Sequence, residues 1–128
     1  MKYASIDIGL KRIGISVCLQ SDIIIPQNAI IRKNRNQAAS DIDKFLSKWQ
    51  INTLIVGLPK GGSSSEEMER RIKHFVSLLK FSGEIFYQDE YASSSEAKEM
   101  MRGVTKQKRD GKIDSIAAKI ILERYFNR

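Results

Sequence analysis

Four acidic residues stand where carboxylates could act together. Asp7 closes one apolar run, Asp89 and Glu90 close another, and Asp114 begins a helical pattern, with Asp110 near enough to join it. Carboxylates gathered in one place repel one another unless a cation neutralises them. Oxygen ligands without His or Cys favour Mg²⁺ or Mn²⁺. Two such ions, about 4 Å apart, can activate water and stabilise the leaving oxygen in phosphodiester hydrolysis. The pattern therefore indicates a two-metal hydrolytic site.

Each acid also has a purely structural interpretation. Asp7 could pair with the basic residues that follow it, because acids are rarely buried without a partner. Asp89 and Glu90 could be ordinary acids of a surface loop. Asp114 could be a first-turn acid that interacts favourably with the helix dipole. The catalytic hypothesis therefore depends on the set of acids and not on any one of them.

Basic residues flank these acids along the chain. Lys11 and Arg12 follow Asp7, and a second group lies before Asp114: Lys98, Arg102, Lys106, Lys108, Arg109 and Lys112. A basic rim around an acidic centre suits cleavage of a polyanion, since the rim contacts phosphates while metal ions neutralise the acids. The alternatives are a solvated run of charge and, for Lys11 or Arg12, a salt bridge to Asp7.

Composition narrows the class of protein. The chain has 128 residues, enough for a single domain over 1–128 with a real core. Its 22 Lys and Arg exceed its 15 Asp and Glu, and a formal charge of +7 favours nucleic acid as the partner over a merely basic surface. No apolar run is long enough to cross a membrane, and no signal-peptide pattern opens the chain. Together with the single Cys18, this predicts a cytoplasmic protein.

Nucleophilic catalysis finds little support in the sequence. The only histidine, His74, lies within a helical pattern among basic residues and is predicted to be exposed. It has no plausible Ser and Asp partners for a triad, and Cys18 has no obvious base.

The first half of the chain predicts most of a sheet. Alternating apolar residues predict a hairpin over 3–19, with Asp7 on its first strand. A third strand follows at Ile23–Ile31, in which Pro26 indicates an edge strand, a bulge or an irregular start. Helical periodicity then covers Gln37–Trp49, and the apolar run Thr53–Gly57 is typical of a central parallel strand.

The second half supplies the remaining elements. Capping boxes at Ser63 and Ser64 begin a helix that we expect Gly83 to end. A strand at Glu84–Tyr87, a capped helix over 93–101 and a basic loop over 102–111 lead to a last helix at Ile113–Phe126, with Asp114 on its inward face. The fold class is therefore α/β, a five-stranded mixed sheet with three antiparallel strands and then two parallel ones, flanked by helices. Ligand sites of such sheets lie at the carboxyl ends of the strands.

Four motifs, in order and at matching spacing, resemble the YqgF/RuvX family over nearly the whole chain. The family patterns are D-x-G-x-K-R-I-G, V-G-L-P, D-E-R-hydrophobic-T-T-x-x-A and D-x-x-A-A-x-x-I-L-x-x-Y. Their counterparts here are Asp7–Gly14, Val56–Pro59, Asp89–Ala97 and Asp114–Tyr125.

The resemblance implies an RNase H-like fold and a metal-dependent nuclease of the bacterial cytoplasm. It implies a role in maturing the 5′ end of 16S ribosomal RNA, with precursor rRNA and ribosomal particles as partners. The family's acidic site carries over onto Asp7, onto Glu90 or Asp89, and onto Asp114. In this assignment Asp7 bridges both metal ions and the other acids each complete one site.

The sequence departs from related patterns at a few positions. Tyr91 replaces the family's usual Arg, which removes one phosphate-binding charge, and Ser93 and Ser94 replace two Thr residues. Gly57 stands where true junction resolvases carry a Glu at the end of the fourth strand. This change weakens the junction-resolving interpretation and leaves the fifth strand to supply the second carboxylate.

Three other functions compete with this interpretation. A Holliday junction resolvase would act on branched DNA and needs two active sites, hence a dimer. A nucleic-acid-binding factor without catalysis would bind but release no product. The acid-x-Gly hairpin also occurs in actin-like ATPases, which need a second similar domain that 128 residues cannot hold. We expect a monomer or a weak homodimer.

Overall fold

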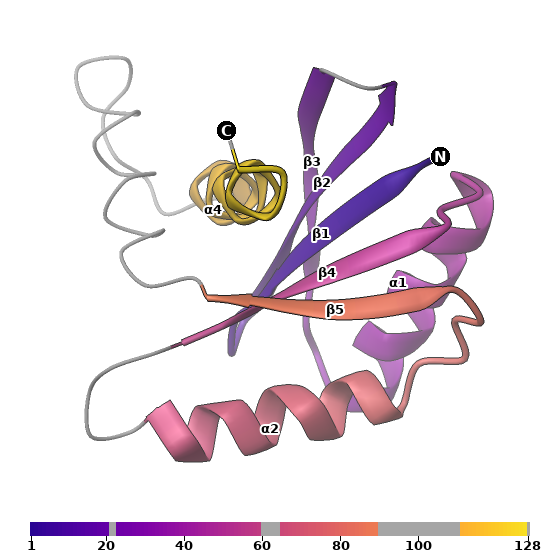
Figure 1. The fold of residues 1–128 in the computed structure, drawn as a ribbon. Coiled ribbons are helices and arrows are strands. Elements are labelled where there is room, and N and C mark those ends of the chain that lie inside the picture. Colours follow the sequence, from indigo (N-terminus) through magenta and orange to yellow (C-terminus); the bar gives the residue numbers. More distant parts are fainter. Residues whose placement is uncertain (21–22, 60–64, 90–110, 128) are drawn as a thin grey trace.

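A computed structural model describes residues 1–20, 23–59, 65–89 and 111–127. One mixed sheet with strand order β3-β2-β1-β4-β5 has α1 and α2 on one face and α4 on the other (Figure 1). The strands are β1 (Tyr3–Ile8), β2 (Arg12–Gln20), β3 (Ile23–Ile31), β4 (Thr53–Leu58) and β5 (Glu84–Asp89). The helices are α1 (Arg35–Lys48), α2 (Ser65–Ser77) and α4 (Gly111–Tyr125).

The strand directions are those that the sequence predicts. β1 and β2 are antiparallel, as are β2 and β3, whereas β4 is parallel to β1 and β5 is parallel to β4. β3 is an edge strand, which explains how it accommodates Pro26 opposite Ser16. All six residues of β4 are buried, because this strand lies within the sheet and is covered on both faces.

Helix α1 begins two residues earlier than its apolar period predicts. Asn34 caps it, and the Asn34 side chain accepts a hydrogen bond of 2.8 Å from the backbone N–H of Gln37. The Gln37 side chain accepts in turn from the backbone N–H of Asn34, which completes a capping box. Ala38, Ile42 and Leu46 are buried along one stripe of the helix, so this face packs on the sheet.

The prediction that Gly83 ends α2 is wrong, because the helix ends at Ser77. Gly83 lies just before β5, where the backbone of another segment passes close to it. A Cβ atom at Gly83 would lie 2.3 Å from the carbonyl oxygen of Asn52 and 2.4 Å from the ring of Phe81. The glycine is therefore required by a close approach and not by a helix end. Ser63 and Ser64, with their predicted caps, lie outside the described residues.

Helix α4 begins at Gly111, two residues before its predicted start, and covers the sheet face opposite to α1 and α2 (Figure 1). Ala118, Ile121 and Leu122 are fully buried, and Ile121 and Leu122 pack against Ile55 of β4. The helix predicted over 93–101 and the basic loop before α4 lie outside the described residues. Among the helices of the described ranges, none combines the length and apolar character that crossing a membrane requires.

Two buried serines connect α4 to the centre of the sheet. The hydroxyl groups of Ser5 and Ser16 lie 2.5 Å apart, and the Ser5 hydroxyl donates to the carbonyl oxygen of Ala118. Because Ser5 has a single hydroxyl proton, the Ser16 hydroxyl must be the donor to Ser5. Neither serine is exposed to solvent, so these bonds are made where an unpaired polar group would be costly.

A tight turn joins β1 to β2 directly after Ile8, the neighbour of Asp7. The Gly9 N–H donates to the Arg12 carbonyl oxygen over 3.0 Å, and a Cβ at position 9 would lie 2.6 Å from that oxygen. The residue after β3 also holds the turn, since Arg32 donates from Nη1 to the Gly9 carbonyl and from its backbone N–H to the Lys11 carbonyl, over 2.9 Å and 2.8 Å.

Replacing Ser5 by Ala removes the partner of the buried Ser16 hydroxyl. We expect Ser5→Ala to lower the free energy of unfolding by about 1–3 kcal/mol, measured by chemical denaturation. The double variant Ser5→Ala/Ser16→Ala should lose less than the sum of the two single variants, because no hydroxyl is then left unpaired. Strictly additive losses would contradict the proposed hydrogen-bond chain.

Adding a methyl group at Gly9 forces the turn apart. We expect Gly9→Ala to lower the free energy of unfolding by about 1–3 kcal/mol, because the Arg12 carbonyl must move. Leu10→Ala is the matched control, since Leu10 is 68% exposed in the same turn and should change stability by less than about 0.5 kcal/mol. Equal melting curves for Gly9→Ala and the wild type would show that the turn is not tight.

Candidate active site

Asp7 is the penultimate residue of β1, the central strand, at the carboxyl edge of the sheet. It pairs with Gly14 of β2. On the other side, β1 and β4 pair up to Ile6 and Val56, and one residue further in the same register brings Asp7 beside Gly57. Both lateral neighbours of Asp7 therefore lack a side chain, which leaves the space beside its carboxylate unfilled by them.

The side of β1 that carries Asp7 is the side that faces α4. Tyr3, Ser5 and Asp7 are two residues apart along the strand, so their side chains lie on the same face. The Tyr3 ring lies 6.3 Å from that of Tyr125, and Ser5 bonds to Ala118. These contacts move toward the start of α4 as β1 approaches its carboxyl end, so the first turn of α4 is the part of the helix nearest to Asp7.

Ser115 holds that first turn of α4 against the sheet. Its hydroxyl donates to the carbonyl oxygen of Gln27 and accepts the N–H of Ile15 over 3.4 Å. The pairing of β2 with β3 shifts register between Ile13 and Ile15, and Ser115 supplies hydrogen bonds at this irregularity. Ile15 pairs with Ile6, the neighbour of Asp7. Asp114 directly precedes Ser115, so its backbone is anchored close to Asp7.

Strand β5 contributes the third part of the edge. Asp89 is the last residue of β5 and pairs with Leu58. The Phe86 ring lies 5.8 Å from that of Tyr125, on the α4 face, whereas Lys73 of α2 lies 5.7 Å from the centre of the Tyr87 ring, on the other face. By alternation Gln88, which pairs with Gly57, belongs to the face of Asp7.

The structure thus describes part of the predicted acidic site. Asp7 and the backbone of Asp89 lie at the carboxyl edge, and the backbone of Asp114 lies in the first turn of α4. Glu90 and Asp110, and the side chains of Asp89 and Asp114, are outside the described residues. Within the described part of the chain, no three residues among His, Cys, Asp and Glu come together as a metal site. Asp7 fits a hard divalent cation through its oxygen donors and through the side-chain-free positions on both sides.

Of the predicted basic rim, the structure describes the part that belongs to the turn between β1 and β2. Lys11 is exposed and Arg12 is half-buried, so Lys11 is open to a large ligand. Arg102, Lys106, Lys108, Arg109 and the side chain of Lys112 lie outside the described residues.

Sequence reasoning missed two residues that position the site. Arg32 holds the turn after Asp7, and Ser115 holds the turn that contains Asp114. A signal existed for Ser115, because it is a polar residue beside the apolar face of the last helix. Arg32 directly follows a strand, where a basic residue is unremarkable, so only the folded chain identifies its contacts.

Comparison with known proteins places this geometry in a family. The family model of RuvX, described as Holliday junction resolvase, matches residues 1–128. A protein of Sulfurovum sp. (strain NBC37-1), named "Putative pre-16S rRNA nuclease", is 66% identical over 99% of this chain and 99% of its own. A relative of the same name from Sulfurimonas denitrificans is 55% identical over 100% of this chain and 98% of its own.

Solved structures share the fold at low sequence identity. Thermus thermophilus RuvC in complex with a Holliday junction substrate superposes with a TM-score of 0.64 at 13% identity, over 99% of this chain and 97% of that one. The fowlpox virus resolvase in complex with Holliday junction DNA gives 0.54 at 14% identity, over 98% and 96%. The predicted RNase H-like fold is confirmed, and the match over all 128 residues shows that the chain belongs to the RuvX family.

Proposed function

We propose that this chain is a metal-dependent nuclease that hydrolyses phosphodiester bonds in precursor 16S ribosomal RNA. The observation that carries the proposal is the setting of Asp7. This acid stands at the carboxyl edge of the central strand, between Gly14 and Gly57, on the face that the first turn of α4 covers. The names of the close relatives support the RNA substrate, and the formal charge of +7 supports a polyanion.

The proposed roles follow from the position of each acid. Asp7 is the shared ligand, since it occupies the central strand, and Asp114 approaches from the anchored first turn of α4. When bound, Mg²⁺ or Mn²⁺ would lower the pKa of the attacking water and neutralise charge on the leaving group. Lys11 contacts the phosphate backbone from the exposed turn, and Arg12 and the basic residues of 102–112 continue that rim.

Strand alternation favours Glu90 over Asp89 as the acid from β5. Phe86 and Gln88 belong to the face of Asp7, and Tyr87 belongs to the opposite face. Glu90 lies beyond the end of β5 at Asp89, and the same alternation, extended by one residue, would assign it to the face of Asp7. We therefore assign the second carboxylate to Glu90.

A Holliday junction resolvase is the second candidate, because the matching family model carries that description. Against it stands Gly57, which leaves the end of β4 without a carboxylate. Cleavage of a four-way DNA junction and of a precursor 16S rRNA fragment, compared at equal enzyme concentration, separates the two. Binding of either substrate without any product in Mn²⁺ would instead identify a non-catalytic factor.

We further propose that the chain acts as one cytoplasmic domain, as a monomer or a weak homodimer, on RNA within ribosomal precursor particles. Co-sedimentation with precursor small-subunit particles tests this setting.

Asp7→Asn keeps the shape of the side chain but removes its charge. We expect cleavage of the rRNA fragment to fall at least about 100-fold, while circular dichroism and RNA binding stay unchanged. Glu66→Gln is the control, since Glu66 is an exposed acid on α2, the helix that covers the other face of the sheet. This variant should cleave normally. If Asp7→Asn cleaves as fast as the wild type in Mn²⁺, the site is wrong.

Ser115→Ala should weaken catalysis through the position of Asp114. We expect about tenfold slower cleavage and a higher Mn²⁺ concentration for half-maximal rate, as for other residues that orient metal ligands. Ser16→Ala is the matched control, because it also removes a buried hydroxyl but one that lies away from the first turn of α4. An equal loss of activity in both variants, with no change in metal requirement, would assign Ser115 a structural role alone.

A further inference from the structure

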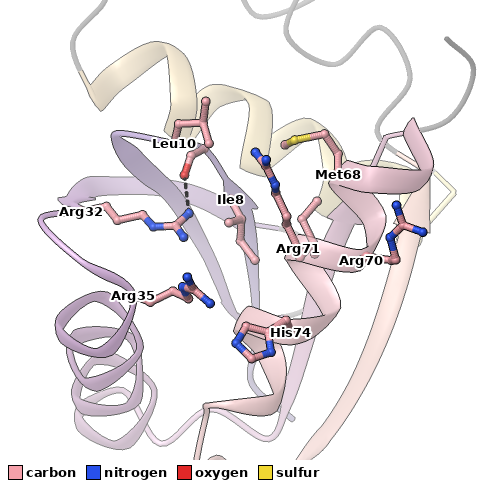
Figure 2. A pocket seen from close by; sticks show the side chains of 10 residues that line it. Ile8, Leu10, Arg32, Arg35, Met68, Arg70, Arg71 and His74 are labelled. Atoms are coloured by element: carbon pink, nitrogen blue, oxygen red, sulfur yellow. Dashed lines mark hydrogen bonds between the residues drawn. The ribbon is translucent and has the colours of Figure 1, made fainter. Parts of the chain in front are cut away.

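A cavity of about 480 Å³ lies on the face of the sheet opposite to that of Asp7. It lies between the turn after β1, the start of α1 and helix α2. Figure 2 shows Arg32 and Arg35 on one side of it, with Arg71 and His74 on the side of α2. We call this cavity, with these four residues at its sides, the Arg pocket. Its inner wall is apolar and includes Ile8, the residue next to Asp7.

The positive charges of the Arg pocket are poorly compensated. None of the described residues that line the cavity is acidic. Arg32 has a backbone carbonyl and the ring of Phe75, 5.4 Å away, as partners, and no carboxylate of the described residues forms an ion pair with Arg32 or Arg35. Arg71 does pair with Glu67 at 2.7 Å, but both side chains are more than half exposed, so water screens this pair strongly.

Burial and the neighbouring cations both act on Arg32. The pKa of Arg32 is lowered from its ordinary value, first by burial and then by the positive charges of Arg35 and Arg71. An arginine stays charged at neutral pH, so the folded protein bears the cost of this repulsion. A bound anion would remove it.

The chemistry of the walls indicates which anion fits. Planar guanidinium groups bind phosphate oxygens through paired hydrogen bonds. The apolar side of the cavity, formed by Ile8, Met68 and Ile72 with the exposed Leu10 at the turn, suits the sugar or base attached to such a phosphate. A small inorganic anion would leave this wall uncovered.

We propose that the Arg pocket binds a phosphorylated nucleotide unit, with Arg32, Arg35 and Arg71 on its phosphate. The unit comes either from the RNA strand that runs to the active site, in which case this inference rests on the proposed function, or from a free nucleotide. Because Arg32 also holds the Gly9 carbonyl, a phosphate in the pocket lies at a defined place relative to Asp7. The pocket thus gives the strand a second anchor, across the sheet edge from the acids.

Binding without cleavage tests the pocket separately from the nuclease proposal. The variant is Arg35→Gln/Arg71→Gln, which spares Arg32 and its contact with the turn. The control is Lys44→Gln/Lys48→Gln, two exposed residues of α1 outside the cavity that give the same change in net charge. Fluorescence anisotropy in EDTA measures the affinity for a single-stranded RNA fragment of the precursor. Amide chemical shifts of Gly9 and Leu10 report binding of AMP, with adenosine as the comparison.

For an RNA strand in the pocket, we expect the arginine variant to lose at least about tenfold in RNA affinity and the lysine control about threefold or less. For a free nucleotide, AMP but not adenosine should shift Gly9 and Leu10 in the wild type and not in the arginine variant. Equal RNA affinities of the two variants, with no shift by AMP, would overturn the proposal. Absence of cleavage by the wild type in Mn²⁺ would overturn the nuclease function and leave this binding result intact.

Discussion

The packing of α4 against β1 controls the geometry at the carboxyl edge of the sheet. It joins segments 88 to 113 residues apart, through the bond from Ser5 to Ala118 and through the contacts of Ser115 with β2 and β3. Both serines are buried, so their hydrogen bonds cannot be exchanged for bonds to water without cost. Since Asp7 lies two residues after Ser5, and Asp114 directly before Ser115, the same contacts determine how closely these two acids approach.

Three glycines lie near Asp7 at this edge. Gly14 and Gly57 flank Asp7 on neighbouring strands, and Gly9 permits a turn in which the Arg12 carbonyl leaves no room for a Cβ atom. The edge consequently has two chemically different sides. The α4 side carries Asp7, and the α2 side carries the Arg pocket, whose charges have few acidic partners. A polyanionic strand that crosses this edge would meet cations on one side and the acidic centre on the other.

Local patterns predicted the elements well where a single physical signal dominates. The third strand, predicted to continue the hairpin, has its predicted bounds in β3, and the continuous apolar run predicted β4 as a buried parallel strand. Predictions were less accurate where one residue type is typical of two different structural situations. Gly83 was assigned to a helix end, but its role is to let Asn52 and Phe81 come close. Glycine permits both situations, and the passing backbone is not visible in a local window.

The sequence alone determined the order of strands and helices along the chain, the α/β class and the candidate acids, because periodicity and residue chemistry are local properties. It also identified the family, since four motifs recur in order along the chain. Only the tertiary structure decided which face of the sheet Asp7 shares with α4. It also decided which residue holds the first turn of that helix in place. It alone brought Arg32, Arg35 and Arg71 together from β3–α1 and α2. These relations depend on long-range packing, in which residues distant along the chain exclude water from one another, and no local pattern encodes that.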